Sequence, residues 1–522
     1  MELTKLIDDE SDVIDIETRA LVAAIDVGSN ALRMGIATYD AEGNTQVIQR
    51  YRVPVRLGHD AFTTGALSAQ SMDDALEAFR EFRRLLDQHH IETYRAHATS
   101  AMRSSRNGLE LVQRIFDETG IVLTLIGGEE EARLVQYSIS KRMDLSNKHA
   151  LLMDMGGGSV EVSFCKDAKV LFSQSFKVGT VRLIEMMNQN VDFKVNFTSK
   201  IQYLRQSVSR NLGKLDVDVC VATGGNATAI GALAVEQGIT DDKDQISRKQ
   251  LGQVIKLLES MSFEDRMTQL GLRPDRADVI LPAAMVFREI MKVAGCKAME
   301  MPDAGLLDGI LFDMLDSEED MLRSRYDNLM AMSRNLGKKF HIDRHFGECV
   351  AKLASSMFDQ LKPLHDLKKE DRTLLEIAGK LHEMGMYINT HRHHHHAAYL
   401  ISEVPLFGIS EKDRAVLAQI FRYQRKSAPN DDHTKFSALN KAEKQKVWHL
   451  SAILRLAIAL NKERRERVKK VMLTFDDKTL NLRLEGSADM LLERWAVLKV
   501  ADYVQQAFGL TLKGDVEGDD RA

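Results

Sequence analysis

The sequence predicts an α/β protein in which two related α/β domains face each other, followed by a helical domain and a small α+β domain. Three observations predict this. A pattern of strand, glycine turn and strand occurs twice, in residues 19–40 and 149–166. Residues 318–468 show helical periodicity, and the last segment returns to strand patterns. A chain of 522 residues is long enough for about three or four domains, each with its own core.

We divide the chain where these patterns change. Residues 1–19 are predicted to be a flexible leader, because they are acidic where a secretory leader would be basic and then apolar. Residues 20–136 and 137–317 form the two α/β domains, and 318–468 the helical domain. Residues 469–522 form the small α+β domain, which contains a hairpin signal around DDKT and ends in the acidic tail GDVEGDDRA.

Composition excludes several classes of protein. With 44% hydrophobic and 28% charged residues the chain is typical of a globular protein, and no apolar run is long enough to span a membrane. The net charge of -5 excludes general affinity for nucleic acid, although a local basic channel for a polyanion remains possible. The four cysteines are far apart, without a CxxC pair, which argues against a disulfide framework or a cysteine metal site and favours a reducing cytoplasm.

The stretch LLMDMGGGSVEVSF, residues 151–164, places three consecutive glycines between two strand patterns. It lacks the Lys-Ser/Thr of a P-loop, and it leads into a strand rather than the helix that follows a dinucleotide-binding motif. A β-turn-β with bare glycines exposes several backbone N–H groups in a row, which suit an anion such as phosphate. A tight hairpin with glycines for geometry only is the alternative. The matching turn that begins at Asp26 favours phosphate.

The two turns supply candidate phosphate-binding residues and candidate metal ligands. Asp154 cannot bind phosphate directly, since both are negative, but it can hold Mg²⁺ or its waters, and the metal then bridges to phosphate. Glu161 lies on the same side of its strand as the turn and can act on metal or water, with a solvated strand face as the alternative. The predicted phosphate-binding residues of the two turns are Asp26, Gly28, Ser29, Asn30, Gly156, Gly157, Gly158 and Ser159.

The two hairpins and a third glycine turn, at Thr223–Asn226, resemble the superfamily of actin, sugar kinases and heat-shock chaperones. Six motifs in order are similar to those of the exopolyphosphatase and guanosine pentaphosphate phosphatase family: AAIDVGSNALRMGIA, ATSAMRSSRNG, IGGEEEARL, LLMDMGGGSVEVSF, SFKVGTVRL and VATGGNATAI. LHEMGMYINTHRHHHHAAYLI and FRYQRK are similar to the helical third domain of long bacterial exopolyphosphatases, so the resemblance covers nearly the whole chain.

This resemblance implies an architecture and further site residues. It implies two actin/hexokinase-like (ribonuclease H-like) domains followed by an all-α HD-like domain, and a homodimer. It also implies phosphate contacts from Gly224 and Gly225 in the third glycine turn.

The motif GGEEEARL supplies the carboxylate chemistry that glycines lack. Hydrolysis of a phosphoanhydride needs a positioned water and an acceptor for its proton, and a carboxylate can provide both. The family resemblance places the catalytic glutamate at Glu131, with Glu130 beside it, and the extra Glu129 leaves the registration open by one residue. The alternative is an acidic first helical turn that complements the helix dipole.

Arg103 lies in the predicted loop ATSAMRSSRNG, which is rich in small hydroxyl residues. Its functional interpretation is a guanidinium clamp on phosphoryl oxygens, and the alternative is an ordinary surface arginine. The family keeps an arginine at the matching place, which favours the clamp. Lys177 and Arg182 flank Gly179 and are weaker candidates.

The helical domain contains a degenerate metal motif. LHEMG, residues 381–385, resembles the His-Asp pair of HD phosphohydrolases, with His345 as a possible further ligand. The pair reads His382-Glu383 and no downstream aspartate stands at the expected place, so the resemblance implies a fold without the two-metal activity. The histidine run, His391 and His393–His396, is predicted to open a helix and to serve structure or adventitious metal binding rather than catalysis.

Two basic clusters follow in the helical domain. FRYQRK, with Arg422, Arg425 and Lys426, has no acidic residue inside it, and we predict that it lines a channel for a polyanion on a helical segment. KERRERVKK, residues 462–470, has interleaved glutamates and fits a solvated charged helix end.

The sequence thus predicts a cytoplasmic, Mg²⁺-dependent exopolyphosphatase that releases orthophosphate from the end of inorganic polyphosphate. Two alternatives stay open. One is a 5′-phosphohydrolase of guanosine pentaphosphate (pppGpp), because the sequence has no dedicated guanine-reading motif that would decide between the substrates. The other is a regulator that binds polyphosphate or an alarmone without hydrolysis. A sugar kinase is disfavoured because no sugar-binding segment is recognisable. Neither a nucleic-acid partner nor membrane insertion is expected.

Overall fold

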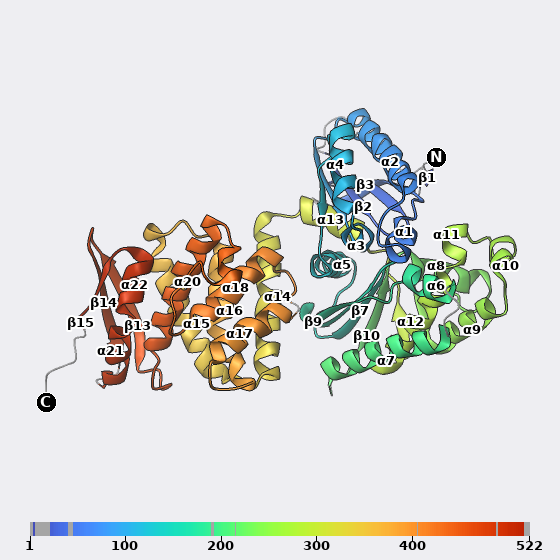
Figure 1. Ribbon diagram of the computed structural model, residues 1–522. Helices are drawn as coiled ribbons and strands as arrows, with labels where there is room; N and C mark the ends of the chain where they lie inside the picture. Colours follow the sequence, from blue (N-terminus) through green and yellow to red (C-terminus); the bar gives the residue numbers. More distant parts are fainter. Residues whose placement is uncertain are drawn as a thin grey trace. The chain divides into compact units, whose positions relative to one another are not determined.

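The computed structural model describes residues 4–5, 21–39, 45–188, 193–213, 216–404, 406–486 and 489–515. The chain forms two compact units, Met1–Arg325 and Tyr326–Ala522 (Figure 1). Most of the predicted leader, and the predicted acidic tail beyond Asp515, lie outside the described residues. Among the helices of the described part, none combines the length and the apolar character that crossing a membrane requires.

The first unit contains two six-stranded sheets with the same core arrangement. In the first sheet the order is β1-β4-β3-β2-β5-β6; β2, β3 and β4 form an antiparallel meander, and β5 and β6 continue parallel to β2. The central strand β2 is buried along its whole length, as a continuous apolar run requires. The strands are β1 (Thr4–Lys5), β2 (Val22–Val27), β3 (Leu32–Tyr39), β4 (Thr45–Val53), β5 (Thr93–Ala98) and β6 (Leu123–Leu125).

The second sheet repeats this plan in the order β11-β12-β10-β7-β8-β9. Strands β7, β8 and β9 form the antiparallel meander, and β10 and β12 continue parallel to β7. The internal repeat predicted from the two strand-turn-strand patterns is therefore confirmed. The strands are β7 (His149–Met155), β8 (Val160–Lys166), β9 (Lys169–Phe176), β10 (Val219–Thr223), β11 (Gln245–Ser247) and β12 (Ala298–Glu300).

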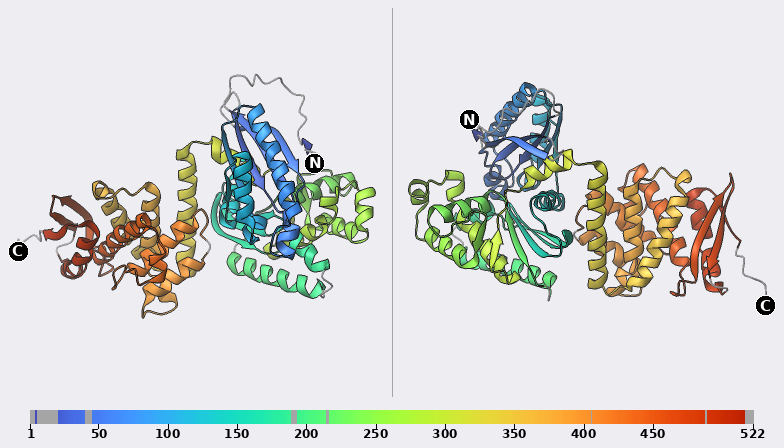
Figure 2. Two further views of the ribbon diagram at one scale, coloured as in Figure 1. Left: turned by 45° about the horizontal axis from the view of Figure 1, so that its top comes forward. Right: turned by 180° about the vertical axis from the view of Figure 1, so that it is seen from behind.

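Helices cover both sheets, and each sheet has its own hydrophobic core. Helices α7 and α12 pack side by side against the second sheet (Figure 2), whereas the chain returns to the first sheet through α13, which packs on β2, β3 and α5. The helices of this unit are α1 (Leu57–Thr63), α2 (Ala69–Gln88), α3 (Ser100–Ser104), α4 (Gly108–Thr119), α5 (Gly128–Arg142), α6 (Thr180–Asn188), α7 (Phe193–Leu212), α8 (Gly225–Glu236), α9 (Arg248–Glu259), α10 (Phe263–Thr268), α11 (Pro274–Ala277), α12 (Ile280–Ala294) and α13 (Leu306–Leu315).

One disulfide corrects the expectation from cysteine spacing. Cys220 in β10 and Cys296, which precedes β12, are bonded to each other, with their Cα atoms 6.4 Å apart. The two residues are 76 positions apart in the sequence. They meet because β10 and β12 are neighbours in the sheet. The other two cysteines, Cys165 and Cys349, are free.

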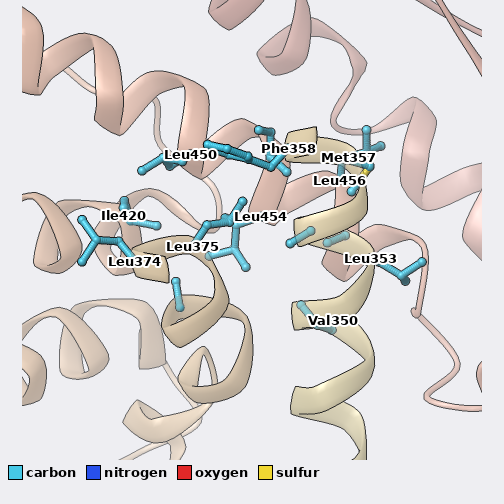
Figure 3. Packing of buried hydrophobic residues seen from close by; sticks show 14 of the residues in the cluster. Val350, Leu353, Met357, Phe358, Leu374, Leu375, Ile420, Leu450, Leu454 and Leu456 are labelled. Carbon is cyan, nitrogen blue, oxygen red and sulfur yellow. The ribbon is translucent and has the colours of Figure 1, made fainter. Parts of the chain in front are cut away.

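The second unit packs helices around one core and ends in a small sheet. Its core includes residues of α15, α16, α18 and α20, among them Val350, Leu374, Ile420 and Leu454 (Figure 3). The helices are α14 (Glu318–Lys339, which begins before the unit), α15 (Arg344–Gln360), η2 (Lys362–Leu364), α16 (Lys369–Leu381), η3 (Met384–Tyr387), α17 (His393–Glu403), α18 (Glu411–Tyr423), α19 (Thr434–Ser437) and α20 (Lys441–Ala459).

The end of the chain forms the predicted hairpin and adds a third strand. Strands β13 (Val468–Phe475) and β14 (Thr479–Gly486) pair antiparallel, and β15 (Thr511–Asp515) pairs parallel with β14. Two short helices, α21 (Leu491–Leu498) and α22 (Ala501–Phe508), lie between β14 and β15 in the sequence. The HD-like character of this unit and the exact domain boundaries stay predictions.

Candidate active site

Two hairpin turns with the same geometry face each other in the first unit. The turn after β2 is closed by the Gly28 N–H, which donates to the Ala31 carbonyl at 3.2 Å, and the turn after β7 by the Gly156 N–H, which donates to the Ser159 carbonyl at 3.0 Å. The strand registers match as well, because the last residue pairs before the turns are Val27–Leu32 and Met155–Val160. The repeated sequence pattern thus produces two equivalent turns.

The glycines between Met155 and Ser159 are explained in part by the facing turn. A Cβ atom on Gly157 would lie 2.9 Å from the Ser29 Cβ and 3.0 Å from a Val181 methyl, and one on Gly158 would overlap the Ser100 side chain. The sequence analysis attributed these missing side chains to phosphate. The structure shows that close approach of the two turns also requires them.

Three carboxylates meet beside the turns. Glu131 is on α5, Asp154 lies near the end of β7 and Glu161 near the start of β8. One carboxylate oxygen from each lies within 4.8 Å of the others. Asp154 and Glu161 are direct partners in the β7–β8 register. Glu131 and Glu161 are only 6% and 3% exposed. The structure therefore brings together the three acidic residues that the sequence singled out from two separate motifs.

The geometry distinguishes Glu131 from Glu130. Arg133 donates to both carboxylate oxygens of Glu130, at 2.7 and 2.9 Å, and also to Asp313 at 2.8 Å. Glu130 is thus held in an ion-pair network with Arg133, whereas Glu131 lies within the carboxylate cluster. The structure favours Glu131 for any chemistry that uses this cluster.

Burial raises the pKa of all three carboxylates, and repulsion within the cluster adds to the shift for Glu131 and Glu161. Burial raises the pKa of Glu131 well above its ordinary value, the negative charges of Glu161 and Asp154 raise it further, and Arg103 opposes the shift. Burial and Asp154 raise the pKa of Glu161 to about 7. Burial also raises the pKa of Asp154, which the hydrogen bond from Thr223 opposes. Like charges this close in a low-dielectric site require either protons or a cation.

The cluster fits a divalent cation that prefers oxygen ligands. The Oε2 atoms of Glu131 and Glu161 are buried and have no hydrogen-bond partner. Hydrogen bonds orient two carboxylates of the cluster: Ser175 donates to Glu161 Oε1 at 2.7 Å, and Thr223 donates to Asp154 Oδ1 at 2.9 Å. The unpartnered oxygen of Glu161 and the neighbouring carboxylate of Asp154 are suitable ligands for Mg²⁺.

Asp26, the counterpart of Asp154 in the first hairpin, has a different environment. Arg33 donates to its Oδ2 at 2.9 Å, and the two residues are register partners on β2 and β3. Burial raises the pKa of Asp26 and the Arg33 charge opposes that shift. The first hairpin therefore carries a charge-compensated aspartate rather than a member of the carboxylate cluster.

A cavity of about 490 Å³ extends from the cluster. Most of the predicted phosphate-binding residues line it, including both hairpin turns and the turn at Gly224, where α8 begins and presents its N-terminus. A helix N-terminus attracts anions through its free N–H groups. Gly224 has φ +87°, and a Cβ there would lie 3.0 Å from Asp154 Oδ1, so this position also requires glycine.

The cavity is rich in arginines that the sequence analysis did not single out. Arg33 and Arg52 are direct register partners on β3 and β4, and like charges in that arrangement are destabilising without an anion between or beside them. Arg52 is ion-paired with Asp275, and Arg276 donates to Asn226. The sequence did hold a signal for them, because Arg50 and Arg52 are two residues apart on β4 and therefore point to the same face of the sheet. The five arginines that line the cavity are Arg33, Arg50, Arg52, Arg273 and Arg276.

Arg103 lies in the short helix α3 rather than in a loop, which corrects the sequence interpretation. Its side chain is exposed, donates to the Ile126 carbonyl and lies close enough to lower the pKa of Glu131 and Glu161. Arg182 instead donates to the Gly158 carbonyl at 2.9 Å and lies over the Phe62 ring at 3.8 Å. Arg182 therefore supports the glycine turn, and Lys177 is exposed.

Comparison with known proteins fits this geometry. The sequence model of the Ppx/GppA phosphatase family matches residues 36–318, and that of domain III of the same family matches residues 330–501. The chain belongs to the Ppx/GppA phosphatase family.

The chain is similar to solved structures over part of its length. An exopolyphosphatase from Cytophaga hutchinsonii is 24% identical, covers 57% of this chain and 98% of its own, and has a TM-score of 0.53. The type II variant of the Aquifex aeolicus Ppx/GppA phosphatase is 26% identical, covers 56% of this chain and 99% of its own, and has a TM-score of 0.46. The actin/hexokinase-like α/β fold predicted from the glycine turns is thereby supported.

The segment that matches domain III of the Ppx/GppA phosphatases carries the predicted channel residues. Helix α18 ends at Tyr423, so Arg425 and Lys426 follow the helix instead of lying on it, and both are exposed. Arg422 is half-buried in the last helical turn. Arg455 fixes the segment by donating to the Tyr423 carbonyl at 2.6 Å and the Lys426 carbonyl at 3.3 Å. Their role toward a polyanion stays a prediction.

The histidine run opens α17, as predicted, and begins it at His393. Burial and the charge of Arg425 lower the pKa of His393 to about 4, and burial and neighbouring cationic groups lower that of His394 to about 3. His382 is buried and its Nδ1 donates to the Gly379 carbonyl at 2.7 Å, while Glu383 is ion-paired with Arg464. His382, His393 and His394 are therefore uncharged near neutral pH and form part of the packing.

The raised pKa of Glu161 predicts that the stability of the metal-free protein depends on pH through this carboxylate. Between its ordinary pKa of 4.5 and the folded value of about 7, the native state keeps a proton that the unfolded state has lost, so stability falls as pH rises. We expect Glu161→Gln to be more stable than the parent at pH 8 by up to a few kcal/mol and to show a much smaller difference at pH 5.

Thermal unfolding with a metal chelator at both pH values measures this difference. Glu130→Gln is the matched control, because the Glu130 carboxylate is half-exposed and paired with Arg133. It should show no such gain at high pH. A Glu161→Gln effect that does not change with pH would contradict the assignment.

Proposed function

We propose that this protein is an exopolyphosphatase that hydrolyses the terminal phosphoanhydride of inorganic polyphosphate with the help of Mg²⁺. The observation that carries the proposal is the buried cluster of Glu131, Asp154 and Glu161 beside two facing glycine turns. The family membership supplies the reaction class, phosphate hydrolysis. The arginine-rich cavity next to the cluster supplies room and charge for a phosphate chain.

The residues divide the chemistry among them. Backbone N–H groups of the two turns and of the α8 N-terminus hold phosphate oxygens. Glu131 orients a water molecule in line with the scissile bond and accepts its proton, while Arg103 stabilises negative charge on the transferred group. Bound Mg²⁺, held by Asp154 and Glu161, would neutralise charge on the phosphoryl oxygens and favour the ionised carboxylates. Ser175 and Thr223 fix the orientation of those two carboxylates.

The role of Glu131 is tested by removing its proton-accepting capacity alone. Glu131→Gln should bind polyphosphate with nearly unchanged affinity, because the phosphate contacts come from other groups. Its kcat should fall by about 10²–10⁴, the usual contribution of a general base. Orthophosphate release and equilibrium binding measure the two quantities.

Glu130→Gln is the matched control for this experiment. It is the neighbouring residue with the same change in charge, but Arg133 holds its carboxylate away from the cluster. This variant should keep most of the wild-type rate. An active Glu131→Gln, or an equal loss in Glu130→Gln, would remove the assignment.

A second candidate substrate, pppGpp, is favoured by the far end of the cavity. There the lining becomes apolar, with Ala229, Ala232, Leu233, Leu270 and Leu272. Glu236 lies in the same lining and offers a carboxylate acceptor to the N–H groups of a guanine edge. A volume of about 490 Å³ is within the usual range for a small-molecule site and suits a nucleotide.

Ala232→Leu distinguishes these substrates, because it fills the apolar end and leaves the phosphate turns unchanged. If pppGpp binds as proposed, kcat/KM for pppGpp should fall about tenfold or more, the effect of excluding a base from well-packed contacts. Hydrolysis of polyphosphate should be little changed. Equal losses with both substrates would contradict the placement of a base there.

The basic segment after α18 is the proposed contact for distant phosphates of a long chain. Replacing Arg422, Arg425 and Lys426 by glutamine should abolish a preference for long polyphosphate over pppGpp in a competition assay, and leave hydrolysis of short substrates intact. The same three substitutions should also weaken the salt dependence of long-chain binding, because fewer phosphates are neutralised. An unchanged long-chain preference would exclude these residues from the path.

The third possibility is a regulator that binds without hydrolysis. Release of orthophosphate by the wild-type protein in the presence of Mg²⁺ would exclude it. Wild-type protein without measurable release from either substrate would favour that regulator. The clustered carboxylates argue for an enzyme, since binding alone would not need three acids beside a phosphate site.

A further inference from the structure

A second mixed cluster of possible metal ligands lies in the second unit. It consists of His345 and Cys349 on α15 and of Glu466, which lies between α20 and β13. One ligand atom from each residue lies within 4.8 Å of the others. His345 Nε2 is 3.2 Å from Glu466 Oε1, and the Cys349 thiol donates to the same carboxylate oxygen.

The position of each ligand follows from local structure. His345 and Cys349 are four residues apart on one helix, so their side chains lie on the same face. The inner side of α15 is fixed by core residues such as Val350 and Leu353 (Figure 3). The cluster is therefore attached to a rigid helix rather than to a loop alone.

The segment that carries Glu466 is also held in place. The Glu466 N–H donates to Asn461 Oδ1 at 3.2 Å. Two residues earlier, Arg464 is ion-paired with Glu383 and lies over the Phe346 ring at 4.3 Å, which attaches the segment to the start of α15. Arg467 pairs with Glu463 at 2.7 Å across the same segment. The carboxylate is thus presented to the two α15 ligands by a braced turn.

The set of donor atoms selects the class of metal. An imidazole, a thiolate and a carboxylate together suit zinc-type transition metals, whereas Mg²⁺ and Ca²⁺ prefer oxygen ligands only. Ligands at about 2.0 Å from a tetrahedral zinc ion lie about 3.3 Å from each other. The observed separation of 3.2 Å between His345 Nε2 and Glu466 Oε1 is close to that value.

We propose that His345, Cys349 and Glu466 form a Zn²⁺ site with three protein ligands and a fourth position open to water. When Zn²⁺ binds, the S–H bond of Cys349 breaks, the sulfur bonds to the metal and the proton passes to solvent. The thiolate and carboxylate then balance the two positive charges. The side chains of His345 and Glu466 are 74% and 46% exposed, so the ion reaches the site directly from solvent.

This site is separate in chemistry from the histidine run and from the carboxylate cluster. Among the described residues, no group of possible metal ligands combines His393–His396 with a cysteine. The cluster of the first unit consists of oxygen ligands only. Cys165 is buried, and burial raises the pKa of its thiol to about 12, which makes it unreactive toward metal. A thiolate signature in metal binding therefore reports on Cys349.

Titration of the full-length protein with Co²⁺ tests the proposal. Cobalt replaces zinc in tetrahedral sites, and a thiolate ligand gives a charge-transfer band in the near ultraviolet that histidine ligands alone do not give. The band should appear with about one equivalent of Co²⁺ and disappear when Zn²⁺ displaces the cobalt. Zinc affinity follows from that displacement.

Variants assign the ligands. Cys349→Ser, which nearly preserves side-chain volume, should abolish the band, and His345→Ala and Glu466→Gln should each weaken Zn²⁺ binding by more than about tenfold, since even outer-shell changes cost metal sites that much. Glu348→Gln is the matched control, because this residue lies on the same helix and pairs with Arg344 outside the cluster. It should bind as the wild type does.

Several results would overturn the proposal. They are the absence of the band in the wild type, a band that persists in Cys349→Ser, or unchanged affinity in both His345→Ala and Glu466→Gln. Circular dichroism and thermal unfolding of each variant establish that a lost signal comes from a folded protein. A folded Cys349→Ser with wild-type cobalt spectrum would assign the metal to another group.

Discussion

The first unit is organised around the repulsion between three buried carboxylates. Glu131 and Glu161 each have one buried oxygen without a hydrogen-bond partner, and the partly buried Asp154 belongs to the same group. Three ionised acids in so small a volume are unfavourable. Burial is the largest cause of the raised pKa of each, and repulsion within the cluster adds to it for Glu131 and Glu161. A fold retains such a feature only if its surroundings hold the groups in place, which is the usual condition of a functional site.

The repeated sheet provides that support. The β7–β8 register sets Asp154 opposite Glu161, and the neighbouring strands β9 and β10 contribute Ser175 and Thr223 to orient them. Glu131 comes from α5, the helix that links the two sheets in the sequence. The return of α13 to pack on both α5 and the first sheet fixes this helix from the other side. The cluster therefore depends on both halves of the first unit, although each half is built from local hairpins.

Short-range patterns explain what could be predicted from the sequence. Each hairpin with its glycine turn, and the acidic motif, is one unbroken stretch of sequence. Residues such as Asp154 and Glu161 could therefore be assigned to the site from the sequence alone. The family resemblance pointed to Glu131 but left its register open by one residue. What separates Glu131 from Glu130 in the structure is the pairing of Glu130 with Arg133, which the sequence does not reveal. The arginines of the cavity were missed because their meaning lies in the pairing of β3 with β4, which brings Arg33 opposite Arg52. The Cys220–Cys296 bond likewise depends on two strands that the sequence separates.

The arginine-rich cavity limits how a phosphate chain can be recognised. Much of its positive charge is already compensated, since Arg33 is paired with Asp26, Arg50 with Asp308 and Arg52 with Asp275. A phosphate that enters must compete with these carboxylates, and each exchange of partner returns little free energy compared with binding to an unpaired cation. The cavity alone therefore favours selectivity over strong attraction. A compact nucleotide can add the apolar contacts of the far end, whereas a long polyphosphate has only its charge. Tight binding of a long chain consequently requires cations beyond those that line the cavity.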